Sequence, residues 1–365
     1  NGRVFFVGSD TFFEVDAAGV VTARGTVATD PDLSPVCITS NGDGGQQLFL
    51  TASGKGYEFN LQTNVLTERI VADAGHCDML DGFIVVLDTS DSTLMASSLF
   101  DATSFPALSH EQRASKPDPW LAIRVVDQQL YAIGERSTDI YYNAGLSPFP
   151  FALAAAGAIP WGIAAPDSLA KVGSSLIWLA RSADSIGAVV QAAGSSAREV
   201  SNHALRTAIR GYRDTVGIAD AIGMSYEEDG HQFYVLTFPA ADATWVLDVS
   251  TGLWTERLTW NTGEGRYMAW RPHWHAIGFG KHLVGDRRAG KIYELTLDVA
   301  TDIDGQPIRR LRRAPALFNK DGGRFMVRRL DVHVQPGLGL PAGQGSAPEM
   351  MLSISRDLQR WHACA

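Results

Sequence analysis

Residues 230–260 read GHQFYVLTFPAADATWVLDVSTGLWTERLTW. Two apolar runs flank a Pro-Ala-Ala-Asp break, and an Asp-Val-Ser-Thr-Gly break precedes a third run that is rich in aromatic residues. Short β-branched and aromatic runs that are separated by turn-forming residues are typical of antiparallel strands joined by tight turns. The stretch therefore predicts three strands within thirty-one residues, and it raises the question whether the chain repeats this unit.

The unit occurs six more times. Each copy has a polar lead, an apolar strand, a polar turn and a second strand that is β-branched or aromatic. The copies lie at residues 2–16, 45–61, 81–96, 127–143, 173–191 and 279–297. The anchor residues of the seven units are Phe5, Phe49, Ile84, Tyr131, Ile177, Phe233 and Leu283, which follow one another at spacings of 35 to 56 residues.

Such a period, with several strands in each repeat, is typical of a β-propeller. A β-sandwich is the competing architecture, but seven regularly spaced hairpins over nearly 300 residues exceed its usual size. We therefore predict an all-β chain that folds as a β-propeller of about seven blades, within a range of six to eight, with short helical and irregular insertions.

The paired strands are expected to be the two inner strands of each blade. Weaker runs such as 18–27 and 64–71 are then the outer strands. Residues 199–210, EVSNHALRTAIR, predict one helix with Ser201 or Asn202 as its N-cap. Its predicted apolar face consists of Ala204, Leu205, Ala208 and Ile209.

The pattern changes near residue 305. Residues 309–336 alternate charged and apolar positions, which predicts longer strands. We therefore divide the chain into a propeller core, 1–305, and a C-terminal region, 306–365, whose strands close the propeller or form a small docking region. The first residue is Asn1 and the chain stops at Ala365, where a further strand is expected, so we expect that both ends are incomplete.

The charge of the chain restricts its function. The net charge is −9, which argues against a protein that coats nucleic acid, because such a protein needs a basic face. Residues 1–120 carry 16 acidic and 6 basic side chains, whereas residues 301–365 carry 6 acidic and 10 basic ones. Opposed charges of this kind suit head-to-tail or stacked assembly.

Two further features bear on location. Three cysteines, Cys37, Cys77 and Cys364, give no disulfide framework, which favours assembly in a reducing cytoplasm. The longest apolar run, 149–166, contains three prolines, so we expect a buried connection there and no membrane span.

The candidate chemistry is sparse. His273 and His275 would share one side of a strand, but two histidines are too few for a zinc site. Cys77 follows His76, yet no nucleophile signature surrounds it, so a buried structural thiol is the preferred interpretation. No metal, cofactor or catalytic residue is predicted. Three acidic residues on predicted hairpin strands could supply an acid and base pair, although the sequence does not place two of them across a cleft: Asp139, Asp248 and Asp298.

Arginines are concentrated near the C-terminus. Seven lie within twenty-one residues, and they could dock a partner or form a solvated strand face. These candidate docking residues are Arg309, Arg310, Arg312, Arg313, Arg324, Arg328 and Arg329. Trp245 is expected in the core, as are most of Trp254, Trp260, Trp270 and Trp274.

Four ordered segments carry a resemblance to a known family. They are 134–151, 200–209, 230–257 and 279–315, and together they span most of residues 120–315. They resemble the packaged-DNA stabilisation protein, also called tail hub or nozzle, of short-tailed bacteriophages. The resemblance implies a propeller-based structural protein of the virion tail, assembled in the host bacterial cytoplasm, and not an enzyme.

The resemblance also implies partners. Such proteins form a homo-oligomer, a ring of six, beneath the head-to-tail adaptor protein, and they support the tail needle or tip, with the tailspike or fibre nearby. The ring encloses viral double-stranded DNA without sequence-specific binding, and helps to retain and eject the genome. An acidic protein suits this role because it repels phosphate and lets DNA leave quickly. We expect ring contacts from the irregular stretch 97–122 and from the arginine-rich strand near 309–329.

The alternative is a carbohydrate-active propeller, namely a glycosidase, sialidase or lectin. Its support is the number of tryptophans and a partial Asp-box turn motif formed by Ser355, Asp357 and Trp361, in which Gln359 and Arg360 depart from the pattern. A glycosidase requires two carboxylates at a defined separation, which distinguishes the two hypotheses.

Overall fold

The structure is a computed structural model. It describes residues 2–29, 34–42, 46–113, 118–155, 157–182, 185–286 and 288–299. In the C-terminal region it describes residues 301, 302, 305, 308–314, 316–319, 326–331, 333, 350–356 and 360–364. The chain divides into two compact units, of which the first is Asn1–Leu258 with Tyr267–Leu295 and the second is Thr259–Arg266 with Thr296–Ala365.

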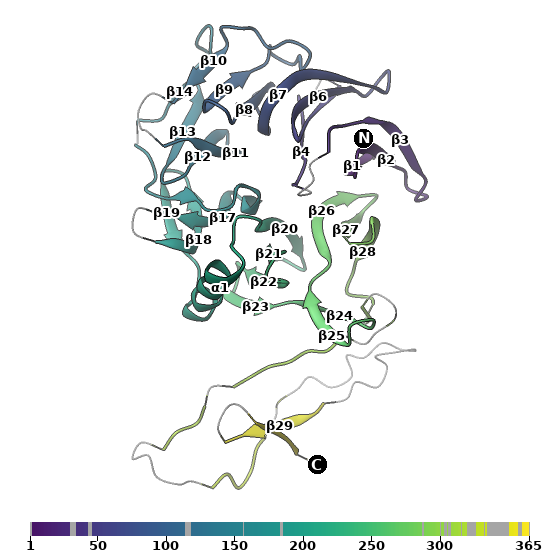
Figure 1. Ribbon diagram of the computed structural model, residues 1–365, viewed down its shortest axis with the longest axis vertical. Coiled ribbons are helices and arrows are strands. Elements are labelled where there is room, and N and C mark those ends of the chain that lie inside the picture. Colours follow the sequence, from purple (N-terminus) through teal and green to yellow (C-terminus); the bar gives the residue numbers. More distant parts are fainter. Residues whose placement is uncertain are drawn as a thin grey trace. The chain divides into compact units, whose positions relative to one another are not determined.

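All seven predicted hairpins are antiparallel strand pairs (Figure 1). They are β1 (Val4–Gly8) with β2 (Thr11–Val15), β5 (Gln47–Ala52) with β6 (Gly54–Asn60), β8 (Phe83–Asp88) with β9 (Thr93–Ala96), β12 (Gln129–Gly134) with β13 (Thr138–Asn143), β17 (Ser175–Arg181) with β18 (Ile186–Ala193), β21 (His231–Phe238) with β22 (Ala243–Asp248), and β27 (Lys281–Asp286) with β28 (Lys291–Leu295).

The turns that lead into these hairpins follow from local chemistry. Asp81 and Gly82 have φ values of 50° and 85°, and Asp229 and Gly230 have φ values of 50° and 75°. Two consecutive residues with positive φ match the right-handed twist of the flanking strands, and Asp-Gly adopts this conformation readily. The Asp-Gly pairs therefore fix where β8 and β21 begin.

Further strands extend each hairpin into a sheet. They are β3 (Val21–Thr26), β4 (Cys37–Ser40), β7 (Val65–Leu80), β10 (His110–Gln112), β11 (Trp120–Val126), β14 (Phe151–Leu153), β15 (Gly162–Ile163), β16 (Ala170–Val172), β19 (Ser196–Glu199), β20 (Ile222–Glu228), β23 (Leu253–Glu256) and β26 (Pro272–Gly278). In the orders β11-β12-β13-β14 and β20-β21-β22-β23 the hairpin occupies the two middle positions, as predicted. The run at 18–27 contains the edge strand β3, and the run at 64–71 begins β7.

Strand β7 joins two hairpin units. Its first part pairs with β6 through Val65–Ile70, and its last part pairs with β8 through Cys77–Leu80. The result is one seven-stranded sheet with the order β10-β9-β8-β7-β6-β5-β4.

The apolar core of the first unit lies between successive sheets. Each junction has buried or partly buried apolar side chains from both neighbouring sheets. Examples along the chain are Phe12 with Leu50, Leu87 with Trp120, Ile133 with Trp178, Leu179 with Tyr234, and Tyr226 with Leu295. A Cβ at Gly278 in β26 would lie 2.3 Å from Val4 in β1, so the last sheet of this unit touches the first. The sheets thus surround an axis, and the fold is an all-β propeller (Figure 1).

The predicted helix is present and extends beyond residue 210. Helix α1 spans His203–Thr215, and the first residues of the predicted segment, up to Glu199, belong to β19. Of the two predicted caps, Asn202 is the one that forms, since its Oδ1 accepts a hydrogen bond of 2.9 Å from the Leu205 amide. Leu205 and Ile209 are buried as predicted. Ala204 is exposed and Ala208 is only half-buried. Among the residues that the structure describes, no helix is both long and apolar enough to cross a membrane.

The predicted strands of 309–336 are not found in the described part of that stretch. Residues 309–314, 316–319 and 326–331 form no ladder, and their large apolar side chains, including Phe318 and Met326, are exposed. Alternating charged and apolar residues form a strand only where the apolar face can be buried. Here the charged and the large apolar side chains are both exposed to solvent. Further along, β29 (Leu352–Ser355) and β30 (Trp361–Cys364) form a hairpin in which Ser355 pairs with Trp361. Asp357 and Gln359 lie outside the described residues.

The prediction that the four later tryptophans are mostly core was wrong. Trp254, Trp260 and Trp270 are half-buried and Trp274 is 37% exposed. Trp254 lies on the edge strand β23, where only one side is covered, and its Nε1 donates to the Val200 carbonyl at 2.8 Å. The fully buried tryptophans among the described residues are Trp120 and Trp178.

Candidate docking residues and an arginine-lined pocket

The predicted docking arginines lie in the second unit. Those that the structure describes are exposed on irregular chain: Arg309, Arg310, Arg312, Arg313, Arg328 and Arg329. Arg324 lies outside the described residues. The guanidinium of Arg313 lies 5.1 Å from the ring centre of Trp361, and Arg329 pairs with Asp331 at 2.8 Å. Exposed pairs of this kind contribute little to stability, so these charges can be changed without disturbing the propeller.

The three acidic residues considered for glycosidase chemistry have different local surroundings. Asp139 in β13 is buried, and its Oδ2 lies 2.9 Å from Arg113 Nε and accepts from Trp120 Nε1 at 3.1 Å. Asp248 ends β22 and orders the following turn by accepting from the Ser250 amide at 3.0 Å. Asp298 was predicted on a strand, but it lies in a turn after β28, because that strand ends at Leu295. Asp139 and Asp248 belong to different sheets, and each serves the local structure around it, so this pair gives no support to glycosidase chemistry.

Cys77 is buried, and the structure brings a second thiol beside it. Cys37 in β4 donates through Sγ to the Cys77 carbonyl at 2.8 Å, and Arg124 in β11 reaches Cys37 Sγ at 3.8 Å. The hydrogen bond with the Cys77 side chain and the charge of Arg124 lower the pKa of Cys37 to about 7, against the effect of burial. Burial raises the pKa of Cys77 well above its ordinary value. No group of three or more His, Cys, Asp or Glu that could hold a metal ion occurs in the described parts of the chain.

His76 makes the stability of this region depend on pH. Desolvation by burial, together with the charge of Arg124, lowers the pKa of His76 to about 4. An unfolded histidine titrates near 6.5, so stability is fully present above about pH 6.5 and is lost as the pH falls towards about 4. Protonated His76 could pair with the Asp167 carboxylate, 3.8 Å from Nε2, which offsets part of the cost. We therefore expect a loss of roughly 2 kcal/mol over this interval.

Urea unfolding of the wild type and of His76→Gln, followed across the same pH interval, measures this effect. The wild type is expected to lose more stability on acidification than the variant, because only the wild type carries the partly buried imidazole. Parallel losses in the two proteins would show that His76 is not the group responsible.

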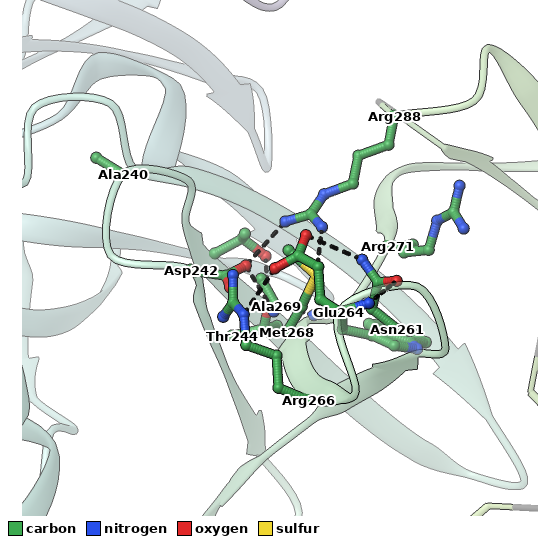
Figure 2. Close-up of polar contacts among 12 residues, drawn as sticks. Ala240, Asp242, Thr244, Asn261, Glu264, Arg266, Met268, Ala269, Arg271 and Arg288 are labelled. Atoms are coloured by element: carbon green, nitrogen blue, oxygen red, sulfur yellow. Dashed lines mark hydrogen bonds and ion pairs between the residues drawn. The ribbon is translucent and has the colours of Figure 1, made fainter.

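Arg288 links the last sheet of the first unit to the neighbouring sheet (Figure 2). Asp242 in the β21–β22 turn pairs with Arg288 Nη2 at 2.8 Å, and the same carboxylate oxygen accepts from the Ala269 amide at 2.9 Å. Arg271 pairs with the buried carboxylate of Asp286 at 2.6 Å. Because each carboxylate already has a cationic partner, these groups serve the architecture.

The first unit also has a pocket with a dense positive charge. Its volume is about 530 Å³. Its lining residues are Arg136, Arg181, Ser182, Ser185, Ile186, Gly187, Arg206, Arg210 and Arg213. Arg136 comes from the β12–β13 turn, Arg181 ends β17, and the last three arginines lie on α1. The sequence analysis missed this pocket, although the spacing of 206, 210 and 213 places three arginines on one helix face.

Comparisons with known proteins agree with the fold. Residues 1–300 match the family model described as "Phage_stabilise: Bacteriophage P22 Gp10, beta-propeller". A search of curated proteins finds no match.

Solved structures give only distant likenesses. One is dihydro-heme d1 dehydrogenase NirN in complex with DHE, at 12% identity and a TM-score of 0.48, covering 88% of this chain and 67% of that one. Another is a chain of the mitotic checkpoint complex, at 13% identity and a TM-score of 0.47, covering 80% and 84%. A third is an auxiliary nutrient binding protein from Bacteroides thetaiotaomicron, at 9% identity and a TM-score of 0.42, covering 80% and 65%.

Proposed function

Because the chain belongs to the phage-stabilisation β-propeller family of bacteriophage P22 Gp10, we propose that it is the tail hub, or nozzle, subunit of a short-tailed phage. The family is one of phage structural proteins that stabilise packaged DNA, which makes the chain a virion component and favours a role without catalysis. The observation that carries the proposal is the match of residues 1–300, a range that contains every strand of the propeller.

In this proposal six copies form a ring beneath the head-to-tail adaptor protein and continue the DNA channel. The ring also carries the tail needle or tip, with a tailspike or fibre nearby, and is assembled in the host cytoplasm. The net charge of −9 supports a conduit that repels DNA phosphate, so that the genome passes without being held. About seven blades remain our prediction for each subunit, supported by the way β7 pairs with β6 and then with β8.

Contacts between copies are proposed on the segment 97–122. Leu99, Phe100 and Leu108 are large apolar residues of this segment that are exposed, and Leu108 is 70% exposed. The segment is irregular before β10, with an isolated bridge between Ser98 and Asp101. Exposed apolar side chains grouped on one insertion are typical of an interaction surface.

Electron microscopy and light scattering of the purified chain test the ring. We expect six-fold rings for the wild type, and a shift to smaller species for Leu108→Asp, because a carboxylate would have to be buried in the contact. Thermal unfolding of the monomer serves as the control and should not change, since Leu108 is exposed. A wild type that stays monomeric at every concentration contradicts the ring, and a variant that still forms rings contradicts this interface.

The C-terminal arginines are proposed to dock a neighbouring virion protein. We expect that the quadruple variant Arg309→Glu, Arg310→Glu, Arg312→Glu and Arg313→Glu lowers incorporation into tails by at least tenfold, because like charges then oppose docking. The matched control replaces the same four residues with lysine, which keeps the charge. Particle yield and tail composition report incorporation. Normal tails from the glutamate variant would refute the docking role.

A further inference from the structure

The arginine-lined pocket has more positive charge than the described carboxylates around it neutralise. Arg181 pairs with Glu135 at 2.5 Å, Arg206 with Glu199 at 3.2 Å and Arg213 with Asp214 at 2.8 Å. Within the described residues, the side chains of Arg136 and Arg210 have no hydrogen-bond or ion-pair partner. Counted over the described residues, the pocket therefore has about two positive charges left over, in a chain whose net charge is −9.

The architecture keeps these guanidiniums close together. Gly187 at the start of β18 has φ of +96°, and a Cβ at this position would lie 2.6 Å from Ile209 Cγ2 on α1. The missing side chain allows α1 to pack closely on β18, while buried Leu205 and Ile209 fix its orientation. Arg206 Nη2 donates to Ser185 Oγ at 3.2 Å, which leaves the hydroxyl hydrogen of Ser185 able to donate to a ligand.

From this arrangement we propose that the pocket binds a phosphate-bearing anion. Each guanidinium group presents several N–H donors in one plane. In this pocket the guanidinium groups come from a turn, a strand end and a helix, so together they can bind a tetrahedral oxyanion through several of its oxygens. A carboxylate has two oxygens and one charge, so a single fork satisfies it. Phosphate matches the surplus of two charges more closely.

The charge of the whole chain indicates the size of the ligand. A long DNA duplex over this site would also lie over acidic surface, which repels it. A compact di- or triphosphate would interact mainly with the local arginines. We therefore expect inorganic pyrophosphate to bind better than a DNA duplex.

Isothermal titration of the full chain with inorganic pyrophosphate at low salt tests the site. We expect one equivalent to bind, and Arg136→Gln or Arg210→Gln to weaken binding by about tenfold or more, because each loses charge-assisted hydrogen bonds. Arg210→Lys should fall between, since it keeps the charge and loses the fork. The matched control is Arg198→Gln, which removes the same charge from exposed strand β19 of the same sheet, outside the pocket lining, and should bind as the wild type does.

Circular dichroism establishes that each variant is folded, which is expected because Arg136 and Arg210 are exposed. Absence of pyrophosphate binding by the wild type overturns the proposal. An equal loss in Arg198→Gln also overturns it, because the effect would then come from net charge. If a short DNA duplex competes with pyrophosphate, the pocket is supported and DNA is the source of the phosphate. If the duplex does not compete, the pocket is supported as a site for a compact ligand. A polyglutamate peptide that binds as tightly as pyrophosphate would refute selectivity for phosphate.

Discussion

Replacing Arg113 with methionine is expected to lower the free energy of unfolding by about 3–5 kcal/mol. The Arg113 side chain is 2% exposed and lies between two buried carboxylates, Asp118 at 3.2 Å and Asp139 at 2.9 Å. It also donates to Ser137 Oγ at 2.8 Å. Arg113 is the only cation of this cluster among the described residues. Its removal leaves two buried carboxylates without a counter-charge, and breaking a buried ion pair in this way is strongly destabilising.

Denaturant unfolding at neutral pH measures the loss. The double variant Arg113→Met with Asp139→Asn should recover part of it, since one uncompensated charge is removed. A matched control breaks the exposed Lys55–Glu68 pair of 2.9 Å by Lys55→Met, where water replaces the partner and no comparable loss is expected. An Arg113→Met protein as stable as the wild type would contradict the argument.

The cluster also fixes the segment on which we propose ring contacts. Arg113 follows β10, Asp118 precedes β11, and Asp139 lies on β13 of the same sheet as β11. The ion pairs therefore anchor the end of the segment 97–122 to a blade. If that segment makes the ring contacts, Arg113→Met should impair ring assembly under conditions where the propeller is still folded.

The local parts of the fold could be predicted from the sequence. Strand pairs and their turns depend on neighbouring residues, so the repeated order of polar lead, apolar strand, polar turn and second strand identified each of the seven hairpins. The N-cap chemistry of Asn202 identified the helix. The alternating stretch 309–336 was misleading, because alternation says which side chains would share a face but not whether anything covers that face.

The sites depend on contacts between distant segments, and these were beyond the sequence. The pocket combines the turn at Arg136 with arginines on α1, some seventy residues later. Cys37 and Cys77 meet only because β4 and β7 pack together. A single sequence without a fold gives no register between such segments. The helical spacing of Arg206, Arg210 and Arg213 was the one local signal available.

The burial of each tryptophan in the fold predicts how much it contributes to stability. Trp178→Ala is expected to destabilise the chain by about 3–5 kcal/mol, because Trp178 is fully buried between two sheets. The substitution leaves a large cavity and also removes the hydrogen bond of 2.9 Å that Nε1 donates to the Gly162 carbonyl. We predicted from the sequence that Trp245 is core, but it is only half-buried, so Trp245→Ala should cost less, about 1–2 kcal/mol.

Comparing the stability losses of the two alanine variants shows whether the loss depends on the burial of the tryptophan or only on the removal of an indole. Both remove an indole from the middle hairpin of a sheet, and Trp245 also loses a weak hydrogen bond of 3.3 Å from Nε1 to Tyr212. Trp178→Phe retains most of the apolar volume and should recover more than half of the loss, with the unpaired Gly162 carbonyl accounting for the remainder. Equal melting temperatures for Trp178→Ala and Trp245→Ala would contradict the placement of Trp178 between the sheets, and with it the packing of the β11–β14 sheet on the sheet that contains β17.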